Sequence, residues 1–91
     1  MDITFDPAKN IRDIDLRGLS FERVAEFEFQ TAVFTGDARR DCGEIRRRAM
    51  GFLDGRLHAL EFVETAKGIR VISFRKANKR EVRRYEQAIQ A

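Results

Sequence analysis

The chain has 91 residues, one cysteine and a formal net charge of +3. This length favours a single small domain, residues 1–91, and a lone cysteine excludes an internal disulfide or a cysteine-rich metal site. No apolar run approaches the roughly 20 residues that span a bilayer, and the acidic start is unlike a signal peptide. We therefore expect a cytoplasmic protein with no membrane partner.

The charge is unevenly distributed along the chain. Residues 1–45 hold six Lys/Arg and ten Asp/Glu, a balance of −4, and residues 46–91 hold twelve and five, a balance of +7. Asymmetry of this kind indicates a polyanionic partner for the second half. The alternative is chance clustering in a short chain.

The first third predicts a very short strand at Ile3–Phe5 and two helices. Asp6 is a good N-cap and Pro7 a good first residue for a helix over residues 7–17, which Gly18 would end in the left-handed region. Ser20 caps a second helix that gives way near residue 29. The apolar residues predicted to face the core are Ile11, Ile14 and Leu16 in the first helix, and Phe21, Val24, Ala25, Phe27 and Phe29 in the second.

A run of strands joined by tight connections follows. The expected elements are a strand at residues 30–34, a polar loop at 36–43, a strand at 45–51, a turn at 53–56, a central strand at 57–63, a turn at 65–68 and a strand at 69–74. The loop contains Cys42, which we interpret as incidental, and Asp54-Gly55 is a strong hairpin signal. Hairpin-linked strands with segregated helices predict an α+β fold, with a small antiparallel sheet of about four strands, two N-terminal helices and a C-terminal helix.

The strand at 45–51 is unusually basic. Arg46 and Arg48 share one face of it, and Arg47 lies on the other, because side chains alternate along a strand. Two interpretations stay open. The strand is an edge strand that charge protects from aggregation, or one of its faces is a basic working surface.

The stretch from Gly68 to Tyr85 reads as a strand that runs into the last helix. Asn78 and Glu81 form a capping box, and Val82, Tyr85 and Ile89 make one apolar stripe. The other side chains around the start of this helix are cationic: Arg75, Lys76, Lys79, Arg80, Arg83 and Arg84.

This basic cluster is unfavourable for stability alone. Cations near a helix N-terminus cost about 0.3–1 kcal/mol each, and the like-charge pairs Lys79/Arg83 and Arg80/Arg84 about 0.2–0.5 kcal/mol each. A bound anion would reverse both effects. The functional interpretation is a phosphate-binding surface for nucleic acid, and the structural alternative is a solvated charged face.

Several kinds of chemistry are absent. The sequence has no glycine-rich phosphate loop, no paired histidines and no zinc spacing, so we predict neither a cofactor nor a metal. His58 reads as structural, and Glu64 either ends its strand in solvent or orients an arginine. Cleavage of RNA by the neighbouring 2′-OH needs no metal, and arginine forks suit the phosphate. Lys76 or Tyr85 could move a proton only with a pKa shifted towards neutrality, and Tyr85 is alternatively a core anchor.

The ordered set of motifs resembles the BrnT family of type II toxins, small ribonucleases with a RelE-like fold. The resemblance rests on Phe5-Asp-Pro-Ala-Lys-Asn10, Gly18-Leu-Ser-Phe-Glu22, residues 46–51, Gly55-Arg-Leu57, residues 69–77, Arg80-Glu81 and Tyr85-Glu86. It implies a toxin that blocks translation by cutting RNA. It also implies a BrnA-like antitoxin that resembles ribbon-helix-helix DNA binders, so that the complex reaches operator DNA through the antitoxin.

Carried over by position, Arg46 and Arg75 match the residues linked with the family's activity. Where the family often has histidine, this chain has Arg17, which could replace a phosphate contact but not proton chemistry near pH 7. The predicted catalytic residues are Arg46, Arg75 and Lys76, and the predicted RNA-binding residues are Arg48, Arg70, Lys79, Arg80, Arg83 and Tyr85. The alternative function is a non-catalytic module, a degenerate toxin that binds nucleic acid or an antitoxin.

Overall fold

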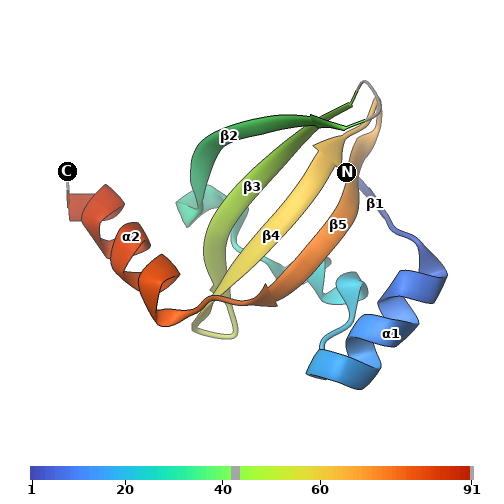
Figure 1. The fold of residues 1–91 in the computed structure, drawn as a ribbon, viewed down its shortest axis with the longest axis horizontal. Helices are drawn as coiled ribbons and strands as arrows, with labels where there is room; N and C mark the ends of the chain where they lie inside the picture. Colours follow the sequence, from blue (N-terminus) through green and yellow to red (C-terminus); the bar gives the residue numbers. More distant parts are fainter. Residues whose placement is uncertain (42–43, 91) are drawn as a thin grey trace.

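The computed structural model describes residues 1–41 and 44–90 of the chain, without the side chains of residues 36–41 (Figure 1). Cys42, predicted to be an incidental loop residue, lies outside the described residues. In chain order the elements are β1 (Asp2–Thr4), α1 (Pro7–Arg17), the 3-10 helices η1 (Phe21–Glu26) and η2 (Phe29–Thr31), β2 (Val33–Asp41), β3 (Glu44–Leu53), β4 (Arg56–Glu64), β5 (Gly68–Lys76) and α2 (Lys79–Gln90).

The sheet has five strands in the order β1-β5-β4-β3-β2. The α+β class is confirmed and β4 is central, as predicted, but an antiparallel sheet of about four strands is wrong. Strand β1 adds a fifth strand and pairs with β5 in parallel, while the other pairs are antiparallel. Gly68 permits this pairing, because a Cβ there would lie 2.0 Å from the carbonyl oxygen of Asp2. The RelE-like likeness stays a prediction.

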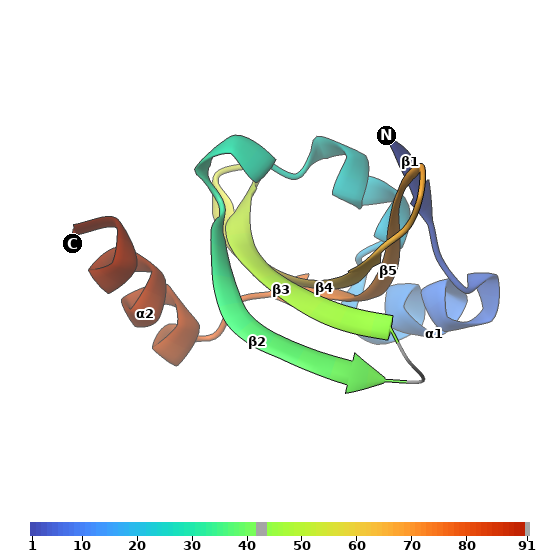
Figure 2. The same ribbon diagram turned by 90° about the horizontal axis from the view of Figure 1, so that it is seen from above.

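The sheet is curved, and η1 and η2 lie on its concave side (Figure 2), where the main core is formed. There Phe21, Val24 and Phe27 pack against apolar residues of β3, β4 and β5, including Leu60 and Phe74. The predicted second α-helix is wrong: the segment forms two short 3-10 helices. Ser20 still caps the first of them, since its hydroxyl oxygen accepts a hydrogen bond from the N–H of Glu22 at 3.1 Å. After this helix, the N–H of Glu28 donates to the carbonyl oxygen of Phe52 in β3 at 3.0 Å. This tertiary bond draws the backbone out of a helical path.

Helix α1 has the predicted bounds and caps but not the predicted inner face. Asp6 accepts from the N–H of Ala8, and Gly18 adopts φ 66°. The three apolar residues expected in the core are exposed instead: Ile11 by 62%, Ile14 by 40% and Leu16 by 79%. The helix lies at the β1–β5 end of the sheet and not over its concave face (Figure 1).

Hydrogen bonds, and not an apolar stripe, hold α1 in place. Asn10 is buried, and its Oδ1 accepts the N–H of Phe21 at 2.8 Å. Lys9 donates from Nζ to the carbonyl of Ile72 in β5. Because these contacts use the main chain of distant segments, apolar periodicity cannot reveal them.

Strand β2 is longer than predicted, and much of the expected polar loop is extended strand. Its pairing with β3 shifts between Thr35 and Arg39 and then resumes to Asp41. An irregularity of this kind lets a strand continue past a break in register. Because β3 lies between β4 and β2, the interpretation of its arginines as protection of an edge strand is wrong. The turn after β3 is as predicted, with positive φ at Asp54 and Gly55.

Helix α2 packs on the convex side of the sheet (Figure 2). Tyr85 is buried there with Met50 and Leu57, and Val82 packs against this small cluster. The far end of the helix contributes less, since Ile89 is 58% exposed. The helix therefore covers one end of the convex face, and the part that carries Arg46 and Arg48 is left uncovered by α2.

Candidate nucleic-acid interface

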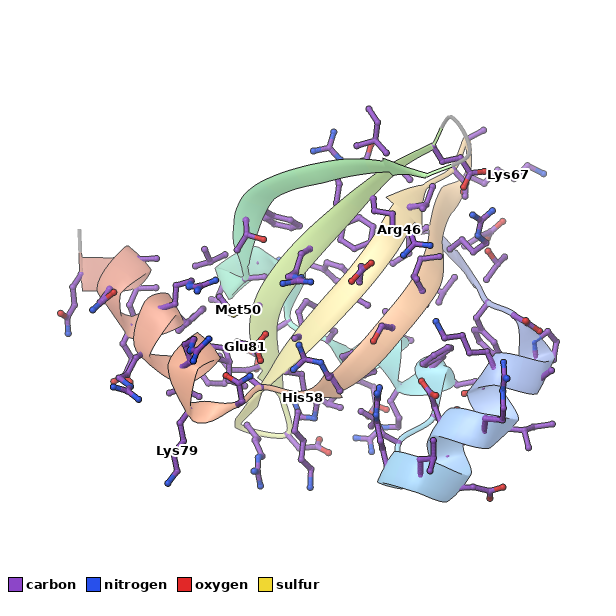
Figure 3. The ribbon with its side chains drawn as sticks, viewed as in Figure 1. Arg46, Met50, His58, Lys67, Lys79 and Glu81 are labelled. Atoms are coloured by element: carbon purple, nitrogen blue, oxygen red, sulfur yellow. The ribbon has the colours of Figure 1, made fainter. Side chains whose placement is uncertain are left out.

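Alternate residues of β3 bring two arginines to the convex face beside one carboxylate. Arg46 and Arg48 both pair with Glu61 of β4, with Nη1–Oε1 and Nη2–Oε2 distances of 3.2 and 3.5 Å. The antiparallel register places Arg48 opposite Glu61. The three side chains are only partly exposed, so the charges interact in a medium less screened than bulk water. Figure 3 shows Arg46 lying over the strands.

Arg75, near the end of β5, reaches the same face and is held by α2. Its Nη1 and Nη2 donate to the two carboxylate oxygens of Glu81 at 2.7 and 2.9 Å, and Nη1 also donates to the carbonyl of Lys76. These bonds use three of the five N–H donors of a guanidinium. Hydrogen bonds from Arg75 lower the pKa of Glu81, and the same bonds raise the pKa of Arg75.

Glu81 also completes the predicted capping box. Its N–H donates to Asn78 Oδ1 at 2.8 Å, and its Oε1 accepts from the N–H of Asn78 at 3.0 Å. One buried carboxylate thus fixes both the start of α2 and the guanidinium of Arg75. Preorganisation of this kind lets an arginine present its remaining donors without losing further side-chain entropy.

A shallow hollow on the convex face joins these groups. It is lined by Arg48, Ala59, Leu60, Glu61, Ser73 and Arg75. Arg70 lies further along β5, on the same side, and forms a two-pronged pair with Glu44 at the start of β3. The structure therefore brings the predicted site residues Arg46, Arg48, Arg70 and Arg75 onto one face of the sheet.

The predicted residues of α2 lie elsewhere. Lys79 and Arg83 line a separate groove of about 530 Å³ together with Arg56 and the apolar residues Leu57 and Val82. Lys79 points away from the sheet in Figure 3, and Arg80 is exposed in the first turn of the helix. Lys76 lines a third hollow beside Arg75.

Tyr85 matches its alternative interpretation as a core anchor. Its side chain is buried, its ring packs edge-on against Phe52, and its hydroxyl donates to the carbonyl of Thr31 at 2.9 Å. The hydroxyl ties α2 to the segment before β2. Little of this side chain is available to an RNA strand.

His58 is buried near the start of β4, opposite the last residue of β5, and packs against the ring of Phe74. Its Nδ1 lies 2.7 Å from the carbonyl of Arg56. Because a carbonyl only accepts, Nδ1 carries the proton. Burial lowers the pKa of His58, so the neutral ring is the favoured form at neutral pH.

The free energy of unfolding should therefore fall as the pH is lowered from 7 to 5. A folded-state pKa below the ordinary 6.5 means that the unfolded chain binds the proton more readily. This contribution is complete above about pH 6.5 and is lost as the pH falls through the folded-state pKa. Urea unfolding at pH 7, 6 and 5 measures it. His58→Asn keeps a donor near Nδ1 but does not titrate, so its profile should be flatter, and an equally steep profile would contradict the assignment.

The comparison with family models identifies the chain. Residues 5–81 match the model of BrnT, described as the ribonuclease toxin of type II toxin-antitoxin systems. The chain belongs to the BrnT family. The match covers most of the sequence, and the resemblance drawn from the motifs is confirmed. A comparison with individually curated proteins finds no match.

Membership of the BrnT family gives the convex face a context. A type II toxin of this family has RNA as its target and an antitoxin as its partner. Across residues 1–41 and 44–90, no helix is long and apolar enough to cross a membrane. Among the side chains that the structure describes, no three His, Cys, Asp or Glu gather as a metal site.

Sequence reasoning missed the two carboxylates that hold arginines on this convex face. Glu61 interrupts an otherwise apolar central strand, and Glu81 was assigned only to the capping box. A glutamate inside a strand that is mostly buried needs a partner, and that signal could have pointed to Glu61. Glu64 fits both of its interpretations, since it is the exposed last residue of β4 and pairs with Arg47 at 3.0 Å.

Proposed function

We propose that this protein is a metal-independent endoribonuclease that cuts RNA in the cytoplasm and blocks translation. Arg46, Arg75 and Lys76 are the proposed catalytic residues, and Arg48 and Arg70 bind the RNA backbone beside them. The observation that carries the proposal is the set of arginines arranged around Glu61 on the part of the convex face that α2 leaves uncovered.

The proposed reaction uses the RNA's own 2′-OH as the nucleophile. The 2′ oxygen loses its proton and attacks the adjacent phosphorus, the bond from phosphorus to the 5′ oxygen breaks, and that oxygen takes up a proton. The products are a 2′,3′-cyclic phosphate and a free 5′-OH. Negative charge builds on the phosphate oxygens during attack, and fixed guanidinium donors stabilise it more than they stabilise the ground state.

The carboxylates keep the arginines ready for that task. Glu61 holds Arg46 and Arg48 together against their mutual repulsion, and Glu81 holds Arg75. An incoming phosphate offers the same bidentate geometry as a carboxylate. The fixed guanidinium groups of Arg48 and Arg75 therefore already face one hollow when RNA arrives.

We further propose that a BrnA-like ribbon-helix-helix antitoxin neutralises the toxin in a hetero-oligomer. In this arrangement, only the antitoxin contacts operator DNA. The exposed apolar residues of α1 support the proposal of a protein partner. Helix α1 exposes Ile11, Ile14 and Leu16 to solvent, which is more apolar surface than a short helix normally leaves uncovered. Co-purification with the product of the adjacent reading frame tests this pairing.

Incubation of the purified protein with RNA in excess chelator tests the enzymatic proposal. We expect defined fragments that end in a 2′,3′-cyclic phosphate, and the same fragments without chelator. Intact RNA in both conditions, together with salt-sensitive binding, would favour the alternative of a non-catalytic nucleic-acid-binding module. Cleavage that stops in chelator would show that the reaction needs a metal.

A further inference from the structure

A third hollow, beside the proposed catalytic face, brings Arg17, which the proposed reaction does not use, together with the proposed catalytic residues Arg75 and Lys76. It lies between the end of α1 and the end of β5, has a volume of about 240 Å³, and is lined by Arg17, Leu19, Arg75 and Lys76. This volume is below the roughly 300 Å³ at which pockets for whole drug-sized ligands begin. It suits one phosphodiester with part of its sugar.

Local structure explains how Arg17 reaches this place. Arg17 is the last residue of α1, and Gly18 turns the chain in the left-handed region, so that Leu19 enters the core directly afterwards. The guanidinium lies 3.6 Å from Oδ2 of the buried Asp13. That oxygen accepts no hydrogen bond from the described residues. Asp13 therefore holds Arg17 loosely and leaves most of its donors available.

The charges around the hollow favour an anion. Arg75 is paired with Glu81 and Arg17 loosely with Asp13, but Lys76 has no ion pair within the described part of the chain. Three cations around one small space repel each other, and a phosphate would reverse the sign of that interaction. The apolar wall at Leu19 offers contact to a ribose.

Arg75 connects this hollow with the proposed catalytic face. The same side chain lines the shallow hollow beside Glu61 and the hollow beside Arg17. A strand whose scissile phosphate lies over the sheet at Arg75 would therefore carry its next phosphate towards Arg17. The two neighbouring phosphates would then share Arg75, and the second would also lie near Arg17.

We propose that Arg17 and Leu19, which border the proposed catalytic Lys76, form a subsite for the RNA phosphodiester next to the scissile one. The proposal rests on the proposed ribonuclease function. It assigns Arg17 to binding the RNA and not to proton transfer. It also gives α1, which lies outside the sheet, a direct part in substrate affinity.

Binding of 2′-O-methylated RNA tests the subsite without relying on cleavage. A tetranucleotide can reach from the surface at Arg75 into the hollow at Arg17, whereas a dinucleotide has one phosphodiester and occupies only one of the two positions. Arg17→Gln should weaken tetranucleotide binding about tenfold more than dinucleotide binding, since it removes a charged hydrogen-bond donor. The salt slope for the tetranucleotide should also fall by about 0.7, the value for one lost phosphate contact on a single strand.

Arg12→Gln is the matched control, because Arg12 is an exposed arginine on the same helix and does not line the hollow. It removes the same charge and should leave the preference for the tetranucleotide unchanged. Equal effects of Arg17→Gln and Arg12→Gln, or equal binding of the two RNAs by the wild-type protein, would overturn the subsite. Failure of the wild-type protein to cut unmodified RNA would instead refute the ribonuclease function, so the two failures are distinguishable.

Discussion

Replacing Arg75 with alanine should lower the rate of RNA cleavage by about 10²–10³-fold. The guanidinium is oriented by the two hydrogen bonds that it donates to Glu81, and it lines both the hollow on the convex face and the hollow beside Arg17. Loss of one preorganised donor to a developing oxyanion typically has this size of effect. Initial rates of fragment formation on a fixed RNA, together with growth arrest on induction in bacteria, measure it.

The experiment needs a control for stability, because Arg75 is paired with the carboxylate of Glu81. Arg75→Ala leaves the carboxylate of Glu81, only 10% exposed, without its cation, so some loss of stability should accompany the loss of activity. The double variant Arg75→Ala/Glu81→Gln removes the uncompensated charge and should regain stability while staying inactive. Full toxicity in either variant, or in Arg46→Ala, would refute the assignment of the site. Arg12→Ala controls for the loss of one positive charge.

Replacing Glu81 with alanine should lower the free energy of unfolding by about 2–3 kcal/mol. The change breaks the half of the capping box that serves the N–H of Asn78, worth about 1 kcal/mol. It also leaves Arg75 without its carboxylate, at a cost between those of exposed and buried ion pairs. Urea unfolding followed by circular dichroism measures the difference.

Glu81→Gln separates the two contributions. Glutamine can still complete a capping box but carries no charge, so this variant should lose only the ion-pair part, about 1–2 kcal/mol. The lowered pKa of Glu81 means that its contribution is complete above pH 4.5 and is lost as the pH falls through the folded-state value. The difference between wild type and Glu81→Gln should therefore shrink in acid. A difference that does not change with pH would contradict the ion pair.

Elements that depend on neighbouring residues could be predicted from the sequence. Asp6 and Gly18 bound α1 as expected, and the Asp54-Gly55 turn has the expected positive φ angles. Such signals act over two to four residues. The inner face of α1 could not be predicted in the same way, because its contacts are distant in sequence. Asn10 bonds to Phe21, 11 positions further along the chain, and Lys9 bonds to Ile72, 63 positions further along.

The same distinction between local and distant contacts applies to the candidate site. The basic strand at Arg46–Arg48 and the cluster after β5 were visible in the sequence, and so was their suitability for phosphate. Which arginines share a surface was not visible. Sheet register and the packing of α2 place Arg46, Arg48, Arg70 and Arg75 together and direct Lys79 and Arg83 to another groove.

The sequence by itself determined the α+β class, the caps and turns, the charge asymmetry and the membership of the BrnT family, because each depends on residue type and on spacing along the chain. Only the tertiary structure decided that Glu61 and Glu81 hold the arginines, that Tyr85 is a core anchor, and that Arg17 and Arg75 line one hollow. The physical reason is that ion pairs and hollows form between side chains that are distant in sequence. Their positions follow from strand order and register, which apolar patterns do not encode residue by residue.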